Sequence, residues 1–369
     1  MKRREFITKG ASGVLAAGAA AATTGVAAPA YAQGKRQLKM VTTWPKNFPG
    51  LGTGCERVAK RINEMTDGQI SIRVFAGGEL VPALSAFDAV SGGTADMYHG
   101  AEYYWQGKSQ AYNFFTATPM GLTPEEHYAW INDLGGQELW DELAAQFNVK
   151  AFMCGSTSSQ TGGWFKNEIK SLEDFKGLKY RIPGLGGEVV RRIGAAVVTL
   201  AGGDIFPALQ SGAIDGAEWV GPWNDLAFGF YKVAKHYYYP GFQEPDSVLA
   251  LGINKDVWES FTKAQQEIIK TACLAECNTM QADYTAHNGD SLKVLIDKHG
   301  VQLHRWPDDI MKEFGRVAGE VVAAAGAADD MSKRVYESFK QAYQTTKAWS
   351  DIGPTAYAMA RELDHTYFK

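Results

Sequence analysis

Two separate series of alternating strands and helices run along the chain, and this alternation restricts the fold more than any other feature. In the first series, residues 54–67 place Cys55, Val58, Ile62 and Met65 on one helical face, and residues 70–74 alternate apolar with polar side chains. The full series is strand 37–43, helix 54–67, strand 70–74, helix 82–91 and strand 96–99. A strand–helix–strand alternation predicts a mainly parallel sheet covered by helices.

The second series repeats the pattern. It comprises strand 179–182, helix 187–193, strand 196–200, helix 205–210 and a strand from residue 214. In both halves a similar segment ends a helix and enters a strand: Ser-Gly-Gly-Thr-Ala-Asp at residues 91–96 and Ser-Gly-Ala-Ile-Asp at residues 211–215. Ordinary glycine capping also accounts for that match. The repeated pattern predicts an α/β fold of two related Rossmann-like lobes.

A further predicted strand, residues 248–253, follows the turn-rich segment 239–246, and we expect it to cross back to the first lobe. Such crossings would form a hinge beside a cleft. The remainder is predicted to be helical over 255–299 and 308–347, separated by a strand-like stretch at 301–306, with Gly315, Gly319 and Gly326 as weak points in the last helix. The predicted division is a leader at 1–32, lobe one at 34–155 with 247–290, lobe two at 156–246 with 291–307, and a C-terminal helical segment at 308–369. That last segment either braces both lobes or mediates dimerisation.

The N-terminus has the pattern of an export signal. Lys2-Arg3-Arg4 precedes an uncharged stretch rich in Ala and Gly, and Ala30-Tyr31-Ala32 is a small-x-small cleavage site. A membrane anchor would need about 20 strongly apolar residues, which this stretch lacks. We therefore expect a mature protein in a bacterial periplasm, exported by the twin-arginine route.

Charge and cysteine content exclude several classes of protein. Removing residues 1–32 leaves 33 basic and 40 acidic residues, so the net charge changes from −4 to −7. A chain without a basic block is not expected to bind nucleic acid or an anionic membrane. The four cysteines lack metal-type spacing, and Cys273 and Cys277 lie one helical turn apart, where a bridge would strain the helix. They are predicted to be buried free thiols.

Arg181 and Glu218 are the leading candidates for a binding site. Each stands where a short apolar segment meets a turn, and in doubly wound sheets ligands bind at the carboxyl ends of strands. A guanidinium can clamp a carboxylate with two parallel hydrogen bonds, and an acid nearby can hold a cation. The pair indicates capture of a small organic anion. The competing interpretation is a surface arginine and an acid on a solvated loop.

Other candidates follow other strands. Tyr103, Tyr104 and Trp105 come after the strand at 96–99, and Gln160 follows a strand at 150–154. Glu244 lies in the proposed crossover. The aromatic pairs and runs at residues 114–115, 164–165 and 237–239 are interpreted as packing. Motifs of hydrolases, zinc enzymes and P-loop proteins are missing from the sequence, and neither Gly-rich turn completes a dinucleotide fingerprint.

Two segments resemble a known family. Residues 172–183, which end Lys-Tyr-Arg-Ile-Pro, and residues 208–219, which end Ile-Asp-Gly-Ala-Glu-Trp, are similar to the periplasmic solute-binding subunits of tripartite ATP-independent periplasmic (TRAP) transporters of the DctP type. Residues 76–80 and 92–97 resemble the first lobe of that family. The resemblance covers most of the mature chain and is greatest to the branch that binds 2-oxo and 2-hydroxy monocarboxylates with a metal ion.

The resemblance implies a fold of the periplasmic binding protein type, a function and a set of site residues. Arg181 would form a salt bridge with the substrate carboxylate, and Tyr103 and Tyr104 would contribute from the opposite lobe. A bridging Na⁺ or Ca²⁺ ion would be bound by a set of oxygens, namely those of Gln160, Glu218, the Trp219 carbonyl and Glu244. Arg181 and Glu218 are then expected to meet through the substrate and not directly. The partners implied are a pyruvate-like or lactate-like anion and the membrane permease.

Two alternatives to this function stay open at the level of sequence. A binding protein of the same family could take a C4-dicarboxylate or a sugar acid. A periplasmic enzyme acting on small acids, with Cys154 or Glu218 as the reactive group, is the second. The lack of a nucleophile–base constellation favours binding over catalysis, so the chain is expected not to be an enzyme. Homodimerisation through the C-terminal helix is also left open.

Overall fold

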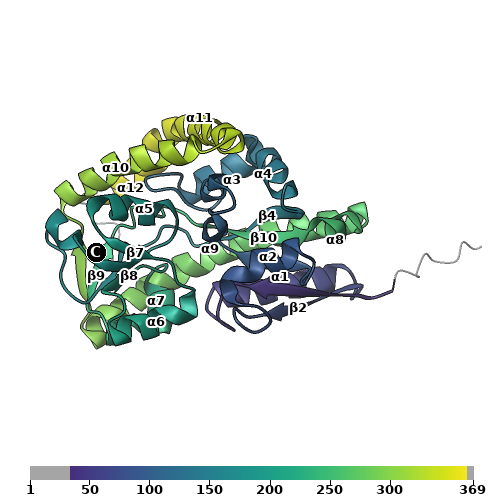
Figure 1. Ribbon diagram of the computed structural model, residues 1–369, viewed down its shortest axis with the longest axis horizontal. Helices are drawn as coiled ribbons and strands as arrows, with labels where there is room; N and C mark the ends of the chain where they lie inside the picture. The colour runs from purple at the N-terminus through teal and green to yellow at the C-terminus, as the bar shows by residue number, and fades with distance from the viewer. Residues whose placement is uncertain (1–33, 364–369) are drawn as a thin grey trace, which may run out of the picture. The chain divides into compact units, whose positions relative to one another are not determined.

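Two β-sheets organise the chain. The computed structural model describes residues 34–363, so the predicted leader at 1–32 lies outside the described residues. The first sheet has five strands in the order β2-β1-β3-β10-β4, and the second has six in the order β11-β9-β5-β8-β6-β7. Helices pack against both sheets (Figure 1). Each predicted strand–helix series therefore forms its own sheet.

The first sheet contains the first predicted series. Its strands are β1 (Arg36–Thr42), β2 (Ile70–Phe75), β3 (Met97–Gly100), β4 (Val149–Ser156) and β10 (Val248–Asn254). Helices α1 (Leu51–Met65) and α2 (Ala86–Ser91) connect the first three of these strands, and β1 pairs in parallel with both β2 and β3. The predicted apolar face of α1 is confirmed for Cys55, Val58 and Ile62, which are fully buried, but not for Met65, which is exposed at the end of the helix.

The second sheet contains the second series. Its strands are β5 (Gly163–Phe165), β6 (Lys179–Arg181), β7 (Ala196–Val198), β8 (Gly216–Ala217), β9 (His236–Tyr239) and β11 (Gln302–Arg305). Helices α5 (Gly184–Ile193) and α6 (Gly202–Ser211) connect β6, β7 and β8, and β6 is parallel to both of its neighbours. Two segments interpreted from sequence as packing, residues 164–165 and 237–239, belong to strands β5 and β9.

Each sheet has one strand that runs against the others, so both sheets are mixed but mainly parallel, as expected. In the first sheet this strand is β10, which lies antiparallel between β3 and β4. In the second it is β5, which lies antiparallel between β8 and β9. Both strands come directly after the chain passes from one sheet to the other, and they enter the new sheet from the opposite end. The prediction that residues 248–253 cross back to the first lobe is confirmed.

The remaining helices surround the sheets. They are α3 (Pro124–Asp133), α4 (Gly136–Ala145), α7 (Pro222–Phe228), α8 (Lys255–Glu259) and α9 (Lys263–His299), with short 3-10 helices η1 (Ala83–Ser85), η2 (Glu102–Trp105), η3 (Gln110–Asn113), η4 (Leu172–Phe175) and η5 (Phe230–Lys232). The helix predicted over 255–299 is interrupted at Thr262, whose side chain caps α9 by accepting from the Gln265 amide. The predicted lobe boundary at 290/291 lies inside α9.

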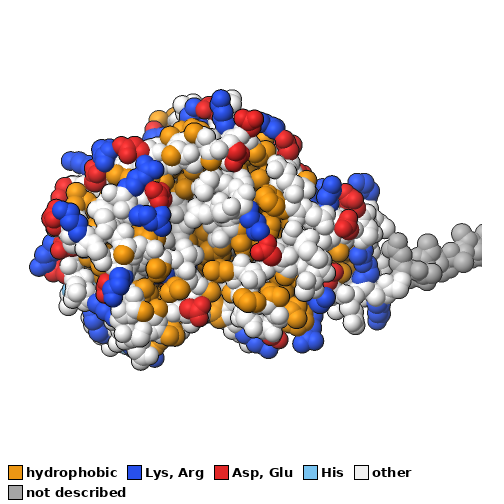
Figure 2. Space-filling view, in the orientation of Figure 1, with side chains coloured by type: hydrophobic (Ala, Val, Ile, Leu, Met, Phe, Trp, Pro, Cys, Tyr) orange, Lys and Arg blue, Asp and Glu red, His pale blue; other side chains and the backbone are white. Residues whose placement is uncertain are grey.

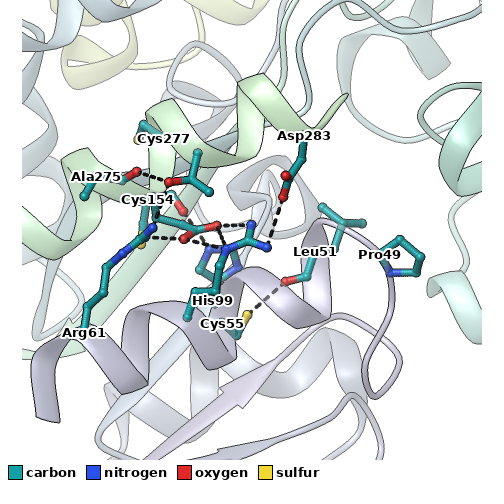
Figure 3. A network of polar contacts seen from close by, with 12 residues as sticks. Pro49, Leu51, Cys55, Arg61, His99, Cys154, Ala275, Cys277 and Asp283 are labelled. Carbon is teal, nitrogen blue, oxygen red and sulfur yellow. Dashed lines mark hydrogen bonds and ion pairs between the residues drawn. The ribbon is translucent and has the colours of Figure 1, made fainter. Parts of the chain in front are cut away.

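Helix α9 joins parts of the fold that are distant in sequence, since it packs on β4, α1 and α7. Its contact with α1 includes the buried Glu276 carboxylate, which accepts hydrogen bonds from Arg57 Nη2 at 2.5 Å and Arg61 Nη1 at 2.6 Å. Asp283, about two helical turns further along α9, pairs with Arg57 at 3.0 Å (Figure 3). Cys154 and Cys277 lie close to this network, and the prediction of buried free thiols is confirmed for all four cysteines.

The C-terminal segment is not the single long helix predicted over 308–347. It forms α10 (Asp308–Gly326), α11 (Asp330–Ile352) and α12 (Pro354–Arg361). The break is local, because α10 ends at Gly326 and the Asp329 side chain caps α11 by accepting from the Ser332 amide at 2.7 Å. Helix α10 packs on α5, whereas α11 packs on α3 and α4. The segment therefore braces the fold, which was one of the two roles predicted for it.

Among the described helices, none is long and apolar enough to cross a membrane.

Candidate functional site

Arg181 and Glu218 lie at the ends of neighbouring parallel strands. Arg181 is the last residue of β6 and is paired in register with Ala217 of β8, and the Glu218 amide donates to the Arg181 carbonyl at 3.1 Å. Pro183, with its fixed φ and missing N–H, follows β6 and precedes α5. The register therefore brings the two side chains to the same carboxyl edge of the sheet.

The two side chains contact each other directly. Arg181 Nη1 lies 2.5 Å from Glu218 Oε1 and 2.9 Å from the Glu218 carbonyl oxygen. The expectation that they meet only through a substrate is wrong for this structure, because a guanidinium and a carboxylate buried side by side are most stable when they pair with each other. The alternative of a surface arginine and a solvated acid is also wrong, since the side chains are 1% and 0% exposed.

Other contacts hold the Arg181 guanidinium in place. Nε and Nη2 donate to the Leu200 carbonyl at 3.2 and 3.0 Å, and Nη2 lies 3.4 Å from the Tyr104 hydroxyl. The guanidinium carbon also lies 5.3 Å from the centre of the Trp219 ring, within the range of a cation–π contact. Tyr104 belongs to η2, which follows β3 of the first sheet. Residues that follow strands of both sheets thus meet at Arg181.

Gln160 and Glu244 lie on two of the segments that pass between the sheets, the one from β4 to β5 and the one from β9 to β10. Gln160 follows β4, Glu244 precedes β10, and the Gln160 amide donates to the Glu244 carbonyl at 3.2 Å. The Gln160 side-chain Nε2 donates to Glu244 Oε2 at 2.8 Å and to Thr157 Oγ1 at 2.9 Å. Both side chains are buried. The two candidates are therefore neighbours although 84 residues separate them in the chain.

The electrostatics link these four residues with Tyr103. Burial raises the pKa of Glu244 to about 7, against the opposing effects of hydrogen bonds from Ser247 and Tyr103 and of the Arg181 charge. Burial also raises the pKa of Glu218 well above its usual value; Arg181 opposes that rise and Glu244 adds to it. Tyr103 packs edge-on against Tyr104, with ring centres 4.9 Å apart. Two carboxyl groups thus share one guanidinium, which makes the site suited to an additional positive charge.

Three buried side-chain oxygens at the site accept no hydrogen bond from any described residue. They are Gln160 Oε1, Glu218 Oε2 and Gln243 Oε1. Unpaired buried acceptors are costly in a protein interior, so such a group commonly marks a missing donor or ion. Oxygens alone, from amides and carboxylates, are the ligands that hard cations prefer. Within residues 34–363 no cluster of three or more His, Cys, Asp or Glu side chains forms a metal site, so a cation here would depend on amide and carbonyl oxygens as well.

Gln243 was not predicted from the sequence. Its Nε2 donates to the Thr161 carbonyl at 2.9 Å, and its side-chain oxygen is buried without a hydrogen bond from the described residues. The signal that could have identified it is position, since it precedes Glu244 in the turn-rich crossover. Trp105, which was a candidate, instead packs in the core with Phe87 and Tyr98.

A groove of about 470 Å³ lies beside the site. Its walls come from loops that follow strands of both sheets, including Thr43, Trp44, Pro82 and Leu200. Leu200 provides the carbonyl that Arg181 binds, and the Trp44 ring packs against Trp219 at 6.1 Å. In the space-filling view, apolar side chains gather near the middle of the visible face and charged ones lie mostly towards its margins (Figure 2).

Comparison with known proteins identifies relatives over most of the chain. Residues 40–329 match the family model of bacterial extracellular solute-binding proteins, family 7 (DctP). A monocarboxylate 2-oxoacid-binding periplasmic protein of Nostoc is 44% identical over 319 residues, which are 86% of this chain and 87% of that protein.

Solved structures agree with that family. A TRAP transporter solute-binding protein of Bordetella bronchiseptica, crystallised with calcium and picolinate, has a TM-score of 0.87 at 34% identity and covers 89% of this chain and 98% of its own. A TRAP periplasmic solute-binding protein of Pseudoalteromonas atlantica, with bound sodium and pyruvate, has a TM-score of 0.85 at 36% identity and covers 88% and 99%. This chain therefore belongs to the DctP family of extracellular solute-binding proteins and is a TRAP transporter solute-binding protein.

Proposed function

We propose that this protein binds a small 2-oxo or 2-hydroxy monocarboxylate, such as pyruvate or lactate, together with a Na⁺ or Ca²⁺ ion and delivers it to the permease of a TRAP transporter. The observation that carries the proposal is the group of three unpaired buried oxygens beside a buried arginine. The Nostoc relative, named for 2-oxoacid binding, and the sodium–pyruvate structure support the same ligand class. No observation favours a C4-dicarboxylate or a sugar acid.

Arg181 is the proposed carboxylate clamp. Its contacts with the Leu200 carbonyl and the Trp219 ring keep the guanidinium plane in position, whereas Glu218 Oε1 is a negatively charged partner that an incoming carboxylate can replace. Tyr104, 3.4 Å from Nη2, and the neighbouring Tyr103 would contact the ligand from the first lobe. Clamp formation is therefore an exchange of one anion for another.

The proposed cation ligands are Gln160, Glu218, the Trp219 carbonyl and Glu244. Gln160 and Glu218 each offer a buried oxygen without a hydrogen bond from the described residues. A bound cation would offset the repulsion between the substrate carboxylate and these acids. Once the cation is bound by both acids, closure of the two lobes would bury the ligand through contacts to each lobe. The lobes are residues 34–155 with 247–290 and residues 156–246 with 291–307.

We infer binding and not catalysis. Cys154 is fully buried, and burial raises the pKa of its thiol well above the usual value, so the thiol stays protonated. Glu218 is already engaged by Arg181. The reactive groups considered from the sequence therefore lack the exposure and the adjacent base that a nucleophile needs.

Export and assembly complete the proposal. The twin-arginine pattern at Arg3-Arg4 supports export to the periplasm, where the family's solute-binding proteins act. Homodimerisation through the C-terminal helices is supported by large apolar side chains that are more than half exposed there, namely Trp349, Ile352, Tyr357, Met359 and Leu363.

Calorimetry on protein depleted of cations tests the ligand and its cation together. The protein is treated with chelator in a sodium-free buffer and titrated with pyruvate alone, with added Ca²⁺, and with added Na⁺. We expect heat of binding only when one of the two cations is present, because Glu218 and Glu244 otherwise repel the anion. Equal affinity in all three titrations would contradict a bridging cation.

A matched pair of arginine variants tests the clamp. Arg181→Lys replaces the planar fork by a point charge and should weaken pyruvate binding at least about tenfold. Arg192→Lys changes a partly exposed arginine of the same lobe, which pairs with Glu188, and should leave the affinity unchanged. Full affinity in Arg181→Lys would rule out the carboxylate clamp.

A further inference from the structure

A second buried acid lies two residues beyond Glu244. Asp246, which has no exposed surface, is part of the crossover from β9 to β10. Its Oδ1 accepts a hydrogen bond of 2.5 Å from the Ser156 hydroxyl, at the end of β4, and its Oδ2 lies 3.2 Å from His127 Nδ1, in α3. We name these three side chains the crossover clamp.

His127 lies between two oxygen atoms. Its Nδ1 is 3.2 Å from Asp246 Oδ2, and its second ring nitrogen, Nε2, lies 3.1 Å from the Phe114 carbonyl oxygen. Ser156 and His127 thus both lie within hydrogen-bond distance of the buried Asp246 carboxyl group, as a buried polar group requires.

The clamp has the residue types of a hydrolase triad but a different connectivity. In a triad the histidine stands between the hydroxyl and the acid, where it can take the proton of the nucleophile. Here Asp246 stands between Ser156 and His127. The hydroxyl therefore donates to a carboxylate that the histidine already engages, an arrangement that holds segments together and activates no nucleophile.

The clamp is attached to both crossover segments. The Ser156 hydroxyl, besides donating to Asp246, accepts from the Ser158 amide at 3.0 Å, and Ser158 has a left-handed φ of 58°. The Thr157 amide donates to the Ser247 carbonyl at 3.1 Å. A non-glycine residue in the left-handed region needs such support from its surroundings. The clamp thus fixes the turn that leads to Gln160.

The positions of Gln160 and Glu244 follow from this arrangement. Gln160 lies two residues after Ser158, and Glu244 lies two residues before Asp246. Beyond the clamp the next contact between the segments is the one between Gln160 and Glu244. The position of both proposed cation ligands relative to each other is therefore set at the clamp.

We propose that His127, Asp246 and Ser156 are positioning residues of the binding site: they hold the two crossover segments in the register that brings Gln160 and Glu244 together, and so set the affinity for the cation and its 2-oxo acid. This inference rests on the proposed function. Residues that orient cation ligands typically change affinity by about 10- to 100-fold when replaced.

The test compares Asp246→Asn and Ser156→Ala with Glu276→Gln. Glu276 is a matched control, because it is another fully buried acid with cationic partners, Arg57 and Arg61, but it joins α1 to α9 and touches neither crossover. Pyruvate affinity is measured by calorimetry at several Ca²⁺ and Na⁺ concentrations, and the unfolding midpoint of each variant is measured in parallel.

Both clamp variants should raise the cation concentration needed for half-maximal pyruvate binding at least about tenfold. Glu276→Gln should lower the unfolding midpoint and leave that concentration within about twofold. Ser156→Ala keeps the pair of His127 and Asp246, so it carries the test if Asp246→Asn does not fold.

Two results would overturn the inference. One is wild-type cation dependence in both clamp variants, or in Ser156→Ala alone if Asp246→Asn does not fold. The other is an equal loss of affinity in Glu276→Gln, which would reduce the effect to general stability. A wild-type protein that binds no 2-oxo acid with either cation would instead refute the proposed function, and with it the role of the clamp.

Discussion

Arg181 has two kinds of contact in the site: some hold its guanidinium in place, and one, with the Glu218 carboxylate, could be replaced by a ligand. The Leu200 and Glu218 carbonyls and the Trp219 ring define where the guanidinium lies, whereas the Glu218 carboxylate supplies the balancing charge. A donor held in advance loses little freedom when a ligand arrives. Arg181 is therefore held ready for the proposed exchange of Glu218 for a substrate carboxylate.

Glu102, outside the binding set, gives the protein a pH-dependent stability. It is buried in η2, where Trp140 Nε1 donates to it at 2.7 Å and the Tyr98 hydroxyl donates to it as well. Burial raises the pKa of Glu102 from 4.5 to about 7, against the effect of those bonds. The folded protein thus keeps a proton that the unfolded chain releases between these values, and stability must fall as pH rises from about 4.5 to 7.

We expect Glu102→Gln to remove this contribution, because the amide cannot ionise. The free energy of unfolding of the wild type should decrease relative to the variant by on the order of 3 kcal/mol across that interval. Urea unfolding at pH 5, 6 and 7.5 measures the difference. Parallel pH profiles for the two proteins would contradict the raised pKa.

At the residue scale the sequence singled out candidate side chains but not how they meet. Arg181, Glu218, Gln160 and Glu244 could be singled out by their positions after strands and in the crossover. Their burial depends on the register of β6 with β8 and on the pairing of the two crossovers. Those are contacts between segments far apart in sequence, which local patterns do not encode.

Among the elements, the C-terminal pair of helices shows how one glycine changes a prediction. Gly326 ends α10, and a Cβ added to it would lie 2.4 Å from Tyr336 Cγ, which belongs to α11. Gly319 lies inside α10, and a Cβ there would meet nothing within 4 Å. Gly326 is therefore required by close packing, whereas Gly319 only lowers the helix propensity.

Alanine at these two positions should have opposite effects on the free energy of unfolding. Gly326→Ala should destabilise the protein by about 1–3 kcal/mol through overpacking. Gly319→Ala should stabilise it by up to about 1 kcal/mol. Thermal and urea unfolding of both variants gives the comparison, and a stabilising Gly326→Ala would show that α11 can move away at no cost.

Elements within the two strand–helix series were predicted, including the short ones. The strand at 37–43 and the helix at 54–67 correspond to β1 and α1 within a few residues, and the strand at 179–182 corresponds to the three-residue β6. Strands β5 and β9 span three and four residues and stand outside the predicted series, so the aromatic residues in them were interpreted as packing. The partners of β5 lie more than 50 residues away, so the local sequence does not reveal this strand.

At the scale of the whole molecule, the crossovers from β4 to β5 and from β9 to β10 affect both the topology and the site. Each reversed strand, β5 or β10, exists because the chain passes from one sheet to the other. The same passages carry Gln160 and Glu244, and the crossover clamp lies between them. Relative movement of the lobes would therefore act on the cation ligands directly, which is a physical basis for coupling closure to binding.

The last prediction concerns assembly. Helix α12 has no buried residue, and the apolar side chains of Tyr357 and Met359 on it are 69% exposed. A surface of this kind is costly in water unless a partner covers it, and a second copy of the chain is the occupant proposed above. A protein that ends at Ile352 should sediment as a monomer at concentrations where the full chain is a dimer.

The truncated protein should keep its affinity for pyruvate, because residues 353–363 contribute nothing to the site around Arg181. Leu274→Ser is the matched control: it removes a single apolar side chain, 52% exposed on α9, and should leave the sedimentation of the full chain unchanged. A truncated protein that still dimerises would place the interface elsewhere. A full chain that sediments as a monomer would contradict the proposed dimer.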